Sequence, residues 1–328
     1  MTAVTLAVLA LCVCLGSVRI PVGEVVSIVA DGVMGRAGSG AAVSIVLRVR
    51  LPRVLCAMLC GSALSLCGAA MQGLLRNPLA DGSTLGVASG ASLGAAAAIL
   101  AGITFPGVPL AGTMVTAILF AFLSLMMILS LAFAMDRNLS THTIILIGII
   151  YTMFVSSVMS LLVTFSGEKL RSITFWTMGS LSGVGYPQVL ILLGTVLLCG
   201  GGLLALSQEL NAFTGGERSA AHLGVDVKRV RFTVLVLVSV MVGVCVSVGG
   251  SIAFVGLVVP HILRRLTGPD HGRLLPACFF GGAVFLMLCD LCARTLLSPV
   301  ELPVGVVTSM IGAAVFVFIF YRTRKGGA

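Results

Sequence analysis

The feature that most limits what this chain can fold into is a succession of long apolar runs. A helix needs about 20 mostly apolar residues to cross the hydrocarbon core of a bilayer. The chain is therefore predicted to be an all-α, polytopic membrane protein with about ten transmembrane helices. The ten candidate runs lie near residues 2–18, 54–75, 80–102, 109–134, 143–165, 188–207, 232–249, 252–266, 276–297 and 304–321.

Composition excludes a water-soluble fold. Of the 328 residues, 58% are hydrophobic and only 9% are charged, whereas soluble domains have about 25% charged residues. The runs are continuous rather than alternating, which favours helices over a β-barrel. Because the stretches between the runs are too short for a second folded domain, residues 1–328 are predicted to form one transmembrane domain.

The first run, residues 2–18, resembles the apolar core of a signal peptide. No Lys or Arg precedes it, and no clear small-residue cleavage site follows it, so we expect it to be retained as a span. The run at 252–266 is short and contains Pro260, which makes it the weakest candidate.

Cysteine and histidine do not indicate a cofactor site. The ten cysteines lie almost entirely inside apolar runs, which is typical of small packing residues. Cys289 and Cys292 have the spacing of a metal or redox pair, but no second pair exists. The four histidines are dispersed in sequence, so we expect this chain to bind no metal or cofactor.

The distribution of basic residues predicts the orientation. The tail after Tyr321 is basic, which favours a cytoplasmic C-terminus, and an even number of spans then places both termini in the cytoplasm. Twelve of the twenty Lys and Arg residues, Arg137 among them, fall on that side. The first external loop breaks the rule with five arginines, so a specific reason must keep them there: Arg19, Arg36, Arg48, Arg50 and Arg53.

Small residues recur at helical spacing in the second and third runs. Gly86, Gly90 and Gly94 are four residues apart, which would place one bare stripe on a helix face. Such a stripe serves close helix packing, a pore wall or a dimer interface, and the sequence leaves these alternatives open. A faint inverted repeat relates Arg48-Val-Arg50 to Arg229-Val-Arg231, a pattern found in transporters.

The loop at about 208–231 contains a predicted short helix within residues 215–226, bounded by glycines. A helix of this length is not stable alone and needs a surface to dock on. The residues of the loop by themselves favour an ordinary solvated connector between two spans.

Seven motifs occur from about residue 45 to the C-terminus. They are Arg50-Leu-Pro-Arg53, Gln72-Gly-Leu-Leu-Arg-Asn77-Pro78-Leu79-Ala-Asp81, Gly86-Val-Ala-Ser-Gly90-Ala-Ser-Leu-Gly94, Phe175-Trp176-Thr-Met-Gly179-Ser180-Leu-Ser, Ala220-Ala-His-Leu-Gly224, Ile252-Ala-Phe254-Val-Gly256-Leu-Val-Val-Pro260-His261-Ile-Leu-Arg264 and Glu301-Leu-Pro303-Val-Gly305. With these motifs the chain resembles the FecCD family, the permease subunits of type II ABC importers for iron–siderophores, haem and vitamin B12. Residues 1–44 carry no such motif.

The resemblance implies a BtuC-like permease fold and a homodimer in the bacterial inner membrane. It implies two partner subunits that hold ATP and Mg, and a periplasmic binding protein that delivers the substrate. An iron chelate or vitamin B12 would then cross by alternating access. The chain has no phosphate-binding loop of its own, so we expect it not to be an enzyme.

The resemblance also assigns roles to particular residues. Arg50, Arg53 and Arg294 correspond to arginines that meet acidic side chains of the binding protein. The ATPase-coupling helix corresponds to Gly216, Glu217, Arg218, Ala220, Ala221, His222, Leu223 and Gly224. Helix packing and the pathway are assigned to Gln72, Asn77, Pro78, Gly86, Gly90, Gly94 and Pro260.

Two alternatives stay open at this point. Asp290 and Arg294 are four residues apart on one predicted helix, so Arg294 could pair with Asp290 instead of a partner protein. An ion-coupled secondary transporter would need ionisable residues at mid-membrane, and Asp290 is the one strong candidate. The substrate cannot be read from these residues.

Overall fold

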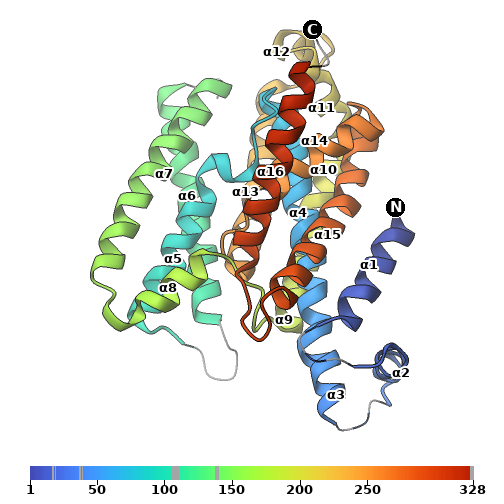
Figure 1. The fold of residues 1–328 in the computed structure, drawn as a ribbon. Coiled ribbons are helices and arrows are strands. Elements are labelled where there is room, and N and C mark those ends of the chain that lie inside the picture. The colour runs from blue at the N-terminus through green and yellow to red at the C-terminus, as the bar shows by residue number, and fades with distance from the viewer. Residues whose placement is uncertain are drawn as a thin grey trace.

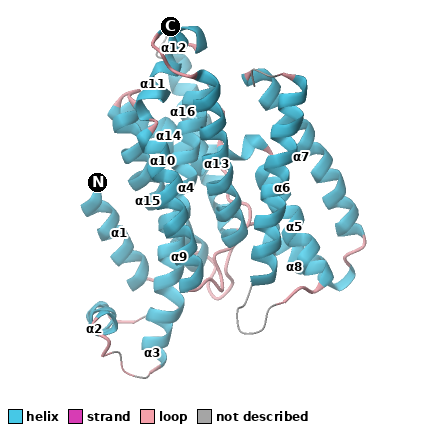
Figure 2. Ribbon diagram, turned by 180° about the vertical axis from the view of Figure 1, so that it is seen from behind, coloured by secondary structure: helices cyan, strands magenta, loops and turns pink. Residues whose placement is uncertain are grey.

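The computed structural model describes residues 1–325 except 17, 19, 37, 39, 105–110 and 137–139, so Arg19 and Arg137 lie outside the described residues. Every regular element of the described chain is helical (Figure 1; Figure 2). This confirms the predicted all-α membrane fold. Six described segments are long and apolar enough to cross a bilayer: Ala41–Leu75, Ala111–Met135, Thr141–Thr164, Tyr186–Ala205, Val227–Gly249 and His271–Thr295.

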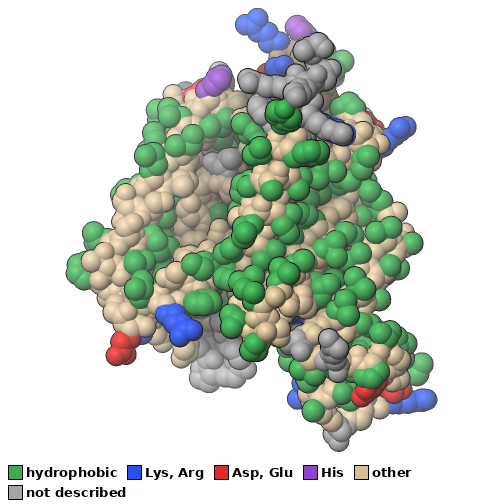
Figure 3. All heavy atoms as spheres, in the orientation of Figure 1, with side chains coloured by type: hydrophobic (Ala, Val, Ile, Leu, Met, Phe, Trp, Pro, Cys, Tyr) green, Lys and Arg blue, Asp and Glu red, His purple; other side chains and the backbone are tan. Residues whose placement is uncertain are grey.

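Each of the ten predicted runs overlaps a helix. Figure 3 shows hydrophobic side chains over the long helices and charged side chains gathered toward the two ends of the molecule. The helices are α1 (Thr2–Cys14), α4 (Leu51–Leu75), α5 (Val87–Ala101), α6 (Ala111–Met135), α7 (Thr141–Thr164), α9 (Tyr186–Thr195) with α10 (Gly201–Ala205), α13 (Val227–Gly249), α14 (Val255–Thr267), α15 (His271–Thr295) and α16 (Val304–Lys325).

The first run forms a shorter helix than predicted. Helix α1 ends at Cys14, so at 1.5 Å per residue it is about 20 Å long. The hydrocarbon core of a bilayer is about 30 Å thick. The helical part of this run is therefore shorter than the hydrocarbon core, and the span predicted at residues 2–18 stays a prediction.

Further short helices occupy the segments between the long ones. The sequence predicted one of them, in the 208–231 loop. Helix α2 is seen nearly end-on beside upright long helices, so it runs across their direction (Figure 1; Figure 2). These helices are α2 (Val22–Val33), α3 (Ala41–Ser44), the π-helical segment η1 (Ile45–Arg50), α8 (Leu170–Thr177), α11 (Ser207–Thr214) and α12 (Glu217–His222).

Helix α4 is the central helix, buried along nearly its whole length. It crosses α15 where Gly61 faces Gly282, and it crosses α14 where Gly68 faces Gly256. A Cβ atom at Gly61 or at Gly68 would overlap the facing backbone carbonyl. Only glycine permits this approach, so the small residues of α4 serve packing inside the subunit.

Two of the three glycines predicted to form a stripe in the third run also serve close helix packing. A Cβ at Gly90 would overlap the Ser124 hydroxyl, and one at Gly94 would lie 2.6 Å from the Thr116 carbonyl oxygen, both on α6. Gly86 does not belong to the stripe, because it precedes α5 with a φ of +81°. The prediction of three glycines on one helix face is therefore wrong for Gly86.

Candidate coupling and docking sites

The predicted short helix of the 208–231 loop is α12, which lies at the same end of the molecule as the C-terminus (Figure 1). Gly216 precedes it with a φ of +104°, and Gly224 follows it with a φ of +84°. Residues with a Cβ rarely adopt these conformations. Two glycines thus fix where this six-residue helix begins and ends.

Helix α12 presents an outward surface. Ala220 is fully buried beneath it, whereas Arg218, Ala221 and His222 are exposed. Leu223, directly after the helix, is 73% exposed. An exposed large apolar side chain beside a basic one is suited to contact with a partner protein.

Helix α12 is anchored to α13 by an ion pair between a half-exposed carboxylate and a buried guanidinium group. Glu217, its first residue, pairs with the guanidinium Nη2 of Arg231, which is only 1% exposed. Thr141 at the start of α7 also donates a hydrogen bond to Glu217, at 3.4 Å. A charge as buried as that of Arg231 needs a partner, so Glu217 is held in place.

Helix α11 is anchored to the start of α15 through Asn211. The Asn211 Nδ2 donates to Asp270 Oδ1 at 2.6 Å, and Asn211 Oδ1 accepts from the His271 backbone N–H at 2.8 Å. Asp270 is the N-cap of α15 and also accepts from the Gly272 backbone N–H at 3.1 Å. The hydrogen bonds from Asn211 and Gly272 lower the pKa of Asp270 below its ordinary value of 3.8. This contribution to stability is thus present above pH 3.8 and lost as the pH falls through the lowered pKa.

Sequence reasoning missed Asn211, Arg231 and Asp270. An aspartate just before a long helix is an N-cap signal, so Asp270 could have been found. Nothing local points to Asn211 or Arg231, because their partners lie 59 and 14 residues away along the chain.

A cluster of arginines and carboxylates lies near the end of α4 opposite to α12. Arg53 Nε bonds to Asp290 Oδ1 at 2.9 Å, and Arg53 Nη1 bonds to Glu301 Oε2 at 2.8 Å. Arg294 Nε pairs with Asp290 Oδ2 at 2.9 Å. Asp290 is fully buried, whereas the Glu301 side chain is 42% exposed. Buried charges of both signs thus neutralise one another between α4 and α15.

The same region holds the C-terminal end of α1. Arg50 Nη1 donates to the carbonyl oxygens of Val13, at 3.2 Å, and Cys14, at 3.0 Å, and its Nη2 donates to that of Val18. Arg294 Nη2 donates to the Cys12 carbonyl oxygen at 3.0 Å. The last carbonyls of a helix lack intrahelical partners and carry partial negative charge, so these arginines cap α1.

The three arginines are therefore not an exposed surface. Arg50 is 4% exposed and Arg53 and Arg294 are each 5% exposed, and all three bond to groups of their own chain. The predicted pairing of Arg294 with Asp290 is confirmed. Helices α1 and α15 supply carbonyls and carboxylates to these arginines, which the sequence did not place there. Their role in docking a binding protein stays a prediction.

We expect Arg50→Lys to loosen α1. A lysine keeps the charge but cannot bond to several carbonyls at once in a planar fork. The loss of hydrogen bonds should cost about 1–3 kcal/mol. Maleimide labelling of Cys12, a buried residue of α1, should then become faster than in the wild type. Arg48→Lys, at an exposed position of the same segment, is the control and should leave the rate unchanged.

Gln72 and Pro260 act together where α4 packs against α14. Pro260 lies inside α14 and has no N–H, which frees the carbonyl of Gly256 four residues earlier. The buried Gln72 of α4 donates to the Gly256 and Leu257 carbonyl oxygens, both at 3.3 Å. The assignment of these two residues to helix packing agrees with this geometry.

Asn77 and Pro78 form the turn after α4. Asn77 Oδ1 accepts from the Leu79 backbone N–H at 2.9 Å, and Pro78 is exposed. Arg76, with a φ of +50°, ends the helix just before them. These contacts make the segment a turn, and none of them indicates a ligand.

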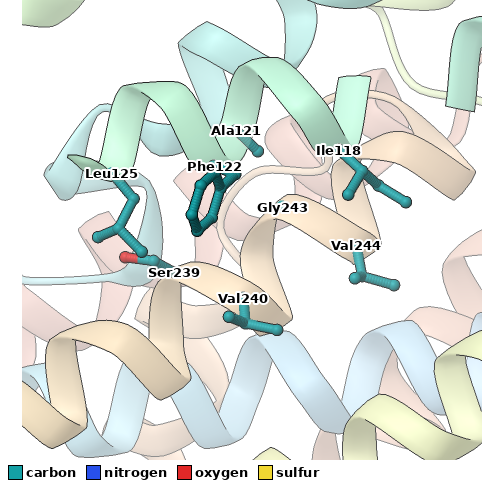
Figure 4. A pocket seen from close by; sticks show the side chains of 8 residues that line it. All are labelled: Ile118, Ala121, Phe122, Leu125, Ser239, Val240, Gly243 and Val244. Atoms are coloured by element: carbon teal, nitrogen blue, oxygen red, sulfur yellow. The ribbon is translucent and has the colours of Figure 1, made fainter. Parts of the chain in front are cut away.

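A small apolar cavity lies between α6 and α13 (Figure 4). Its volume is about 100 Å³, whereas ligand pockets usually have about 300–1,000 Å³. The cavity is therefore too small for a metal chelate. It is lined by Ile118, Ala121, Phe122, Leu125, Ser239, Val240, Gly243 and Val244.

The sequence and the fold of this chain are similar to those of known transport permeases. The model of the FecCD transport family matches residues 4–322, so the similarity also includes the N-terminal residues that lack the seven motifs. The molybdate import system permease protein MolB of Haemophilus influenzae is 38% identical, covering 86% of this chain and 82% of its own. The vitamin B12 import system permease protein BtuC of Klebsiella pneumoniae is 39% identical, covering 100% of this chain and 94% of its own. A solved inward-facing conformation of a metal-chelate type ABC transporter matches with a TM-score of 0.85 and 33% identity, over 98% of this chain and 97% of that one.

Proposed function

Since this chain belongs to the FecCD transport family and is a permease subunit of a type II ABC importer, we propose that it imports an iron chelate or vitamin B12. Relatives of similar identity are named for different cargoes, molybdate and vitamin B12. Molybdate is therefore a further candidate, and the proposed class is a metal-containing compound delivered by a binding protein.

The ATPase is proposed to dock on α12, and this end of the molecule is accordingly proposed to face the cytoplasm. The observation that carries this is a glycine-bounded helix, tied to α13 by an ion pair with the buried Arg231, with Leu223 exposed after it. A helix held in this way would transmit a force applied at its surface. ATP and Mg belong to the partner subunit.

A second copy of the chain is proposed to complete the pathway. Helix α7 buries only Ile144, Ile147, Gly148 and Val155. Its exposed face combines hydroxyl groups with large apolar side chains such as Met153 and Phe154. The apolar side chains are suited to contact with a second copy or with lipid, and the hydroxyl groups would line a passage with weak affinity for its cargo. The exposed hydroxyl side chains are Ser156, Ser157, Ser160 and Thr164.

The environment of Asp290 disfavours the ion-coupled alternative. A coupling carboxylate must bind and release its ion, but Asp290 is fully buried between Arg53 and Arg294. Two guanidinium groups already neutralise it. The carboxylate thus acts better as a fixed structural charge than as an exchange site.

The proposed function is tested by reconstitution in proteoliposomes with the cognate ATPase and binding protein. Cyanocobalamin, ferric siderophore, haem and molybdate are offered as probes. We expect one of them to accumulate only when both partners and ATP are present. Accumulation by this chain alone, driven by a proton or sodium gradient, would overturn the proposal.

We expect Leu223→Asp to weaken binding of the ATPase by about 10- to 100-fold, since burying a leucine contributes about 1.5–3 kcal/mol. Affinity is measured with the detergent-solubilised complex. Leu266→Asp is the matched control, because Leu266 is 74% exposed at the end of α14, another helix. An equal loss in both variants would argue against a specific role for α12.

A further inference from the structure

Asn211 joins α11 to α15 by both ends of its amide group. Its Nδ2 donates to Asp270 and its Oδ1 accepts from the His271 N–H. A carboxylate can only accept, so the amide has one orientation that satisfies both bonds. On either side of Asn211, the side chains of Leu210 and Phe213 are fully buried. They hold α11 firmly against the neighbouring helices.

The connection continues through His271 to α4. His271 Nδ1 lies 2.9 Å from Asn211 Oδ1. That oxygen only accepts, so Nδ1 carries the ring proton. The ring is 1% exposed, and a Cβ added at Gly73 of α4 would overlap its Nε2. A shift of α11 must therefore move the start of α15, because His271 of α15 is bonded to α11 and packs tightly against α4.

Helices α11 and α12, which together form the coupling hairpin, thus have different anchors. Helix α12 is tied to α13 through Glu217 and Arg231, whereas α11 is tied to α15 through Asn211. Helix α15 in turn packs closely on α4, where Gly61 meets Gly282. Without the Asn211 link, an α12 displacement would still reach α13 but would lose its polar connection to α15.

We propose that Asn211 is a positioning residue that passes movement of the coupling hairpin to α15 and, through His271, to α4. This rests on the proposed function, in which an ATPase docks on α12. No substrate needs to contact Asn211 for this role.

The test exchanges the donor and the acceptor. Asn211→Asp places two carboxylates at a contact of 2.6 Å, so α11 and α15 should separate. Adding Asp270→Asn to that variant restores one amide and one carboxylate in reversed order. The new carboxylate at position 211 can accept from the new amide at position 270 and from His271, so the bonds between α11 and α15 can form again. The N-cap bond to Gly272, which the wild type makes to the same Asp270 oxygen, then has to pass to the other side-chain atom of residue 270, its amide oxygen.

The readout is hydrogen exchange of the permease–ATPase complex in nanodiscs, with and without trapping of the nucleotide by vanadate. In the wild type we expect trapping to change exchange both at residues 217–222 and at residues 271–275. In Asn211→Asp the change at 271–275 should vanish while that at 217–222 stays, and basal exchange at His271 should rise by about tenfold. The double variant should regain the wild-type response.

Each other outcome is decisive. If trapping changes residues 217–222 of the wild type but not residues 271–275, or if Asn211→Asp keeps the full response, the inference about Asn211 is wrong. A double variant that fails to regain the response, although its basal exchange is normal, also contradicts it. If trapping leaves residues 217–222 of the wild type unchanged, the docking of an ATPase on α12 fails instead.

Discussion

Gly68→Ala is expected to destabilise the protein by more than about 3 kcal/mol, since a single added methyl group cannot be accommodated between two backbones. Its Cβ would overlap the carbonyl of Gly256, where α4 and α14 cross. Backbone atoms on both sides cannot turn away as a flexible side chain can. The two helices must separate, which also disturbs the bonds from Gln72 to α14.

The measurement is thermal unfolding in detergent, followed with a dye that reacts with the buried cysteines as they become exposed. Gly194→Ala is the matched control, because no heavy atom lies within 4 Å of a Cβ built at that helical position. The control should stabilise α9 by about 0.5–1 kcal/mol, as alanine is the better helix former. If Gly68→Ala melts within about 2 °C of the wild type, the close crossing of α4 and α14 is disproved.

Asp290→Asn is expected to cost about 3–5 kcal/mol, the usual loss when one member of a buried ion pair is removed. The substitution keeps the size of the side chain but removes the charge that both Arg53 and Arg294 face. Arg53 retains Glu301, whereas Arg294 loses the carboxylate with which it pairs. The melting temperature should therefore fall strongly.

Glu301→Gln is the comparison for that variant. It also removes a carboxylate bonded to Arg53, but its side chain is 42% exposed, so water can replace the lost interaction and the cost should be below about 1 kcal/mol. If the free energy of unfolding falls equally in Asp290→Asn and Glu301→Gln, burial does not determine how much each ion pair contributes to stability. Loss of uptake by Asp290→Asn at unchanged stability would instead support ion coupling.

The positions of the long helices could be predicted because hydrophobicity is a local property. A continuous apolar run in a bilayer has to satisfy its backbone internally, and a helix does this without reference to the rest of the chain. Helix α2 was missed because its 12 residues include Glu24 and Asp31 and are too few to span. Its place depends on packing beside α1 and η1.

The candidate site could be predicted only in part. The glycines around α12 and the Asp290–Arg294 spacing are local signals, and both gave the right geometry. The bond from Gln72 to the carbonyl freed by Pro260 spans 184 residues. Pro260 indicates that a donor is needed, but only the crossing of α4 and α14 shows which residue supplies it.

The sequence by itself determined that this is a helical membrane protein of the permease kind and that a short glycine-bounded helix lies in its 208–231 loop. Only the tertiary structure decided which groups the side chains of Arg50 and Arg53 contact. Arg53 meets Asp290 and Glu301 across 237 and 248 residues, and Arg50 meets carbonyls of α1. A charge seen in a sequence shows that a partner is required, because a buried ion is costly alone. The partner is chosen by the fold, which brings distant carboxylates and the unpaired end of a helix to that charge.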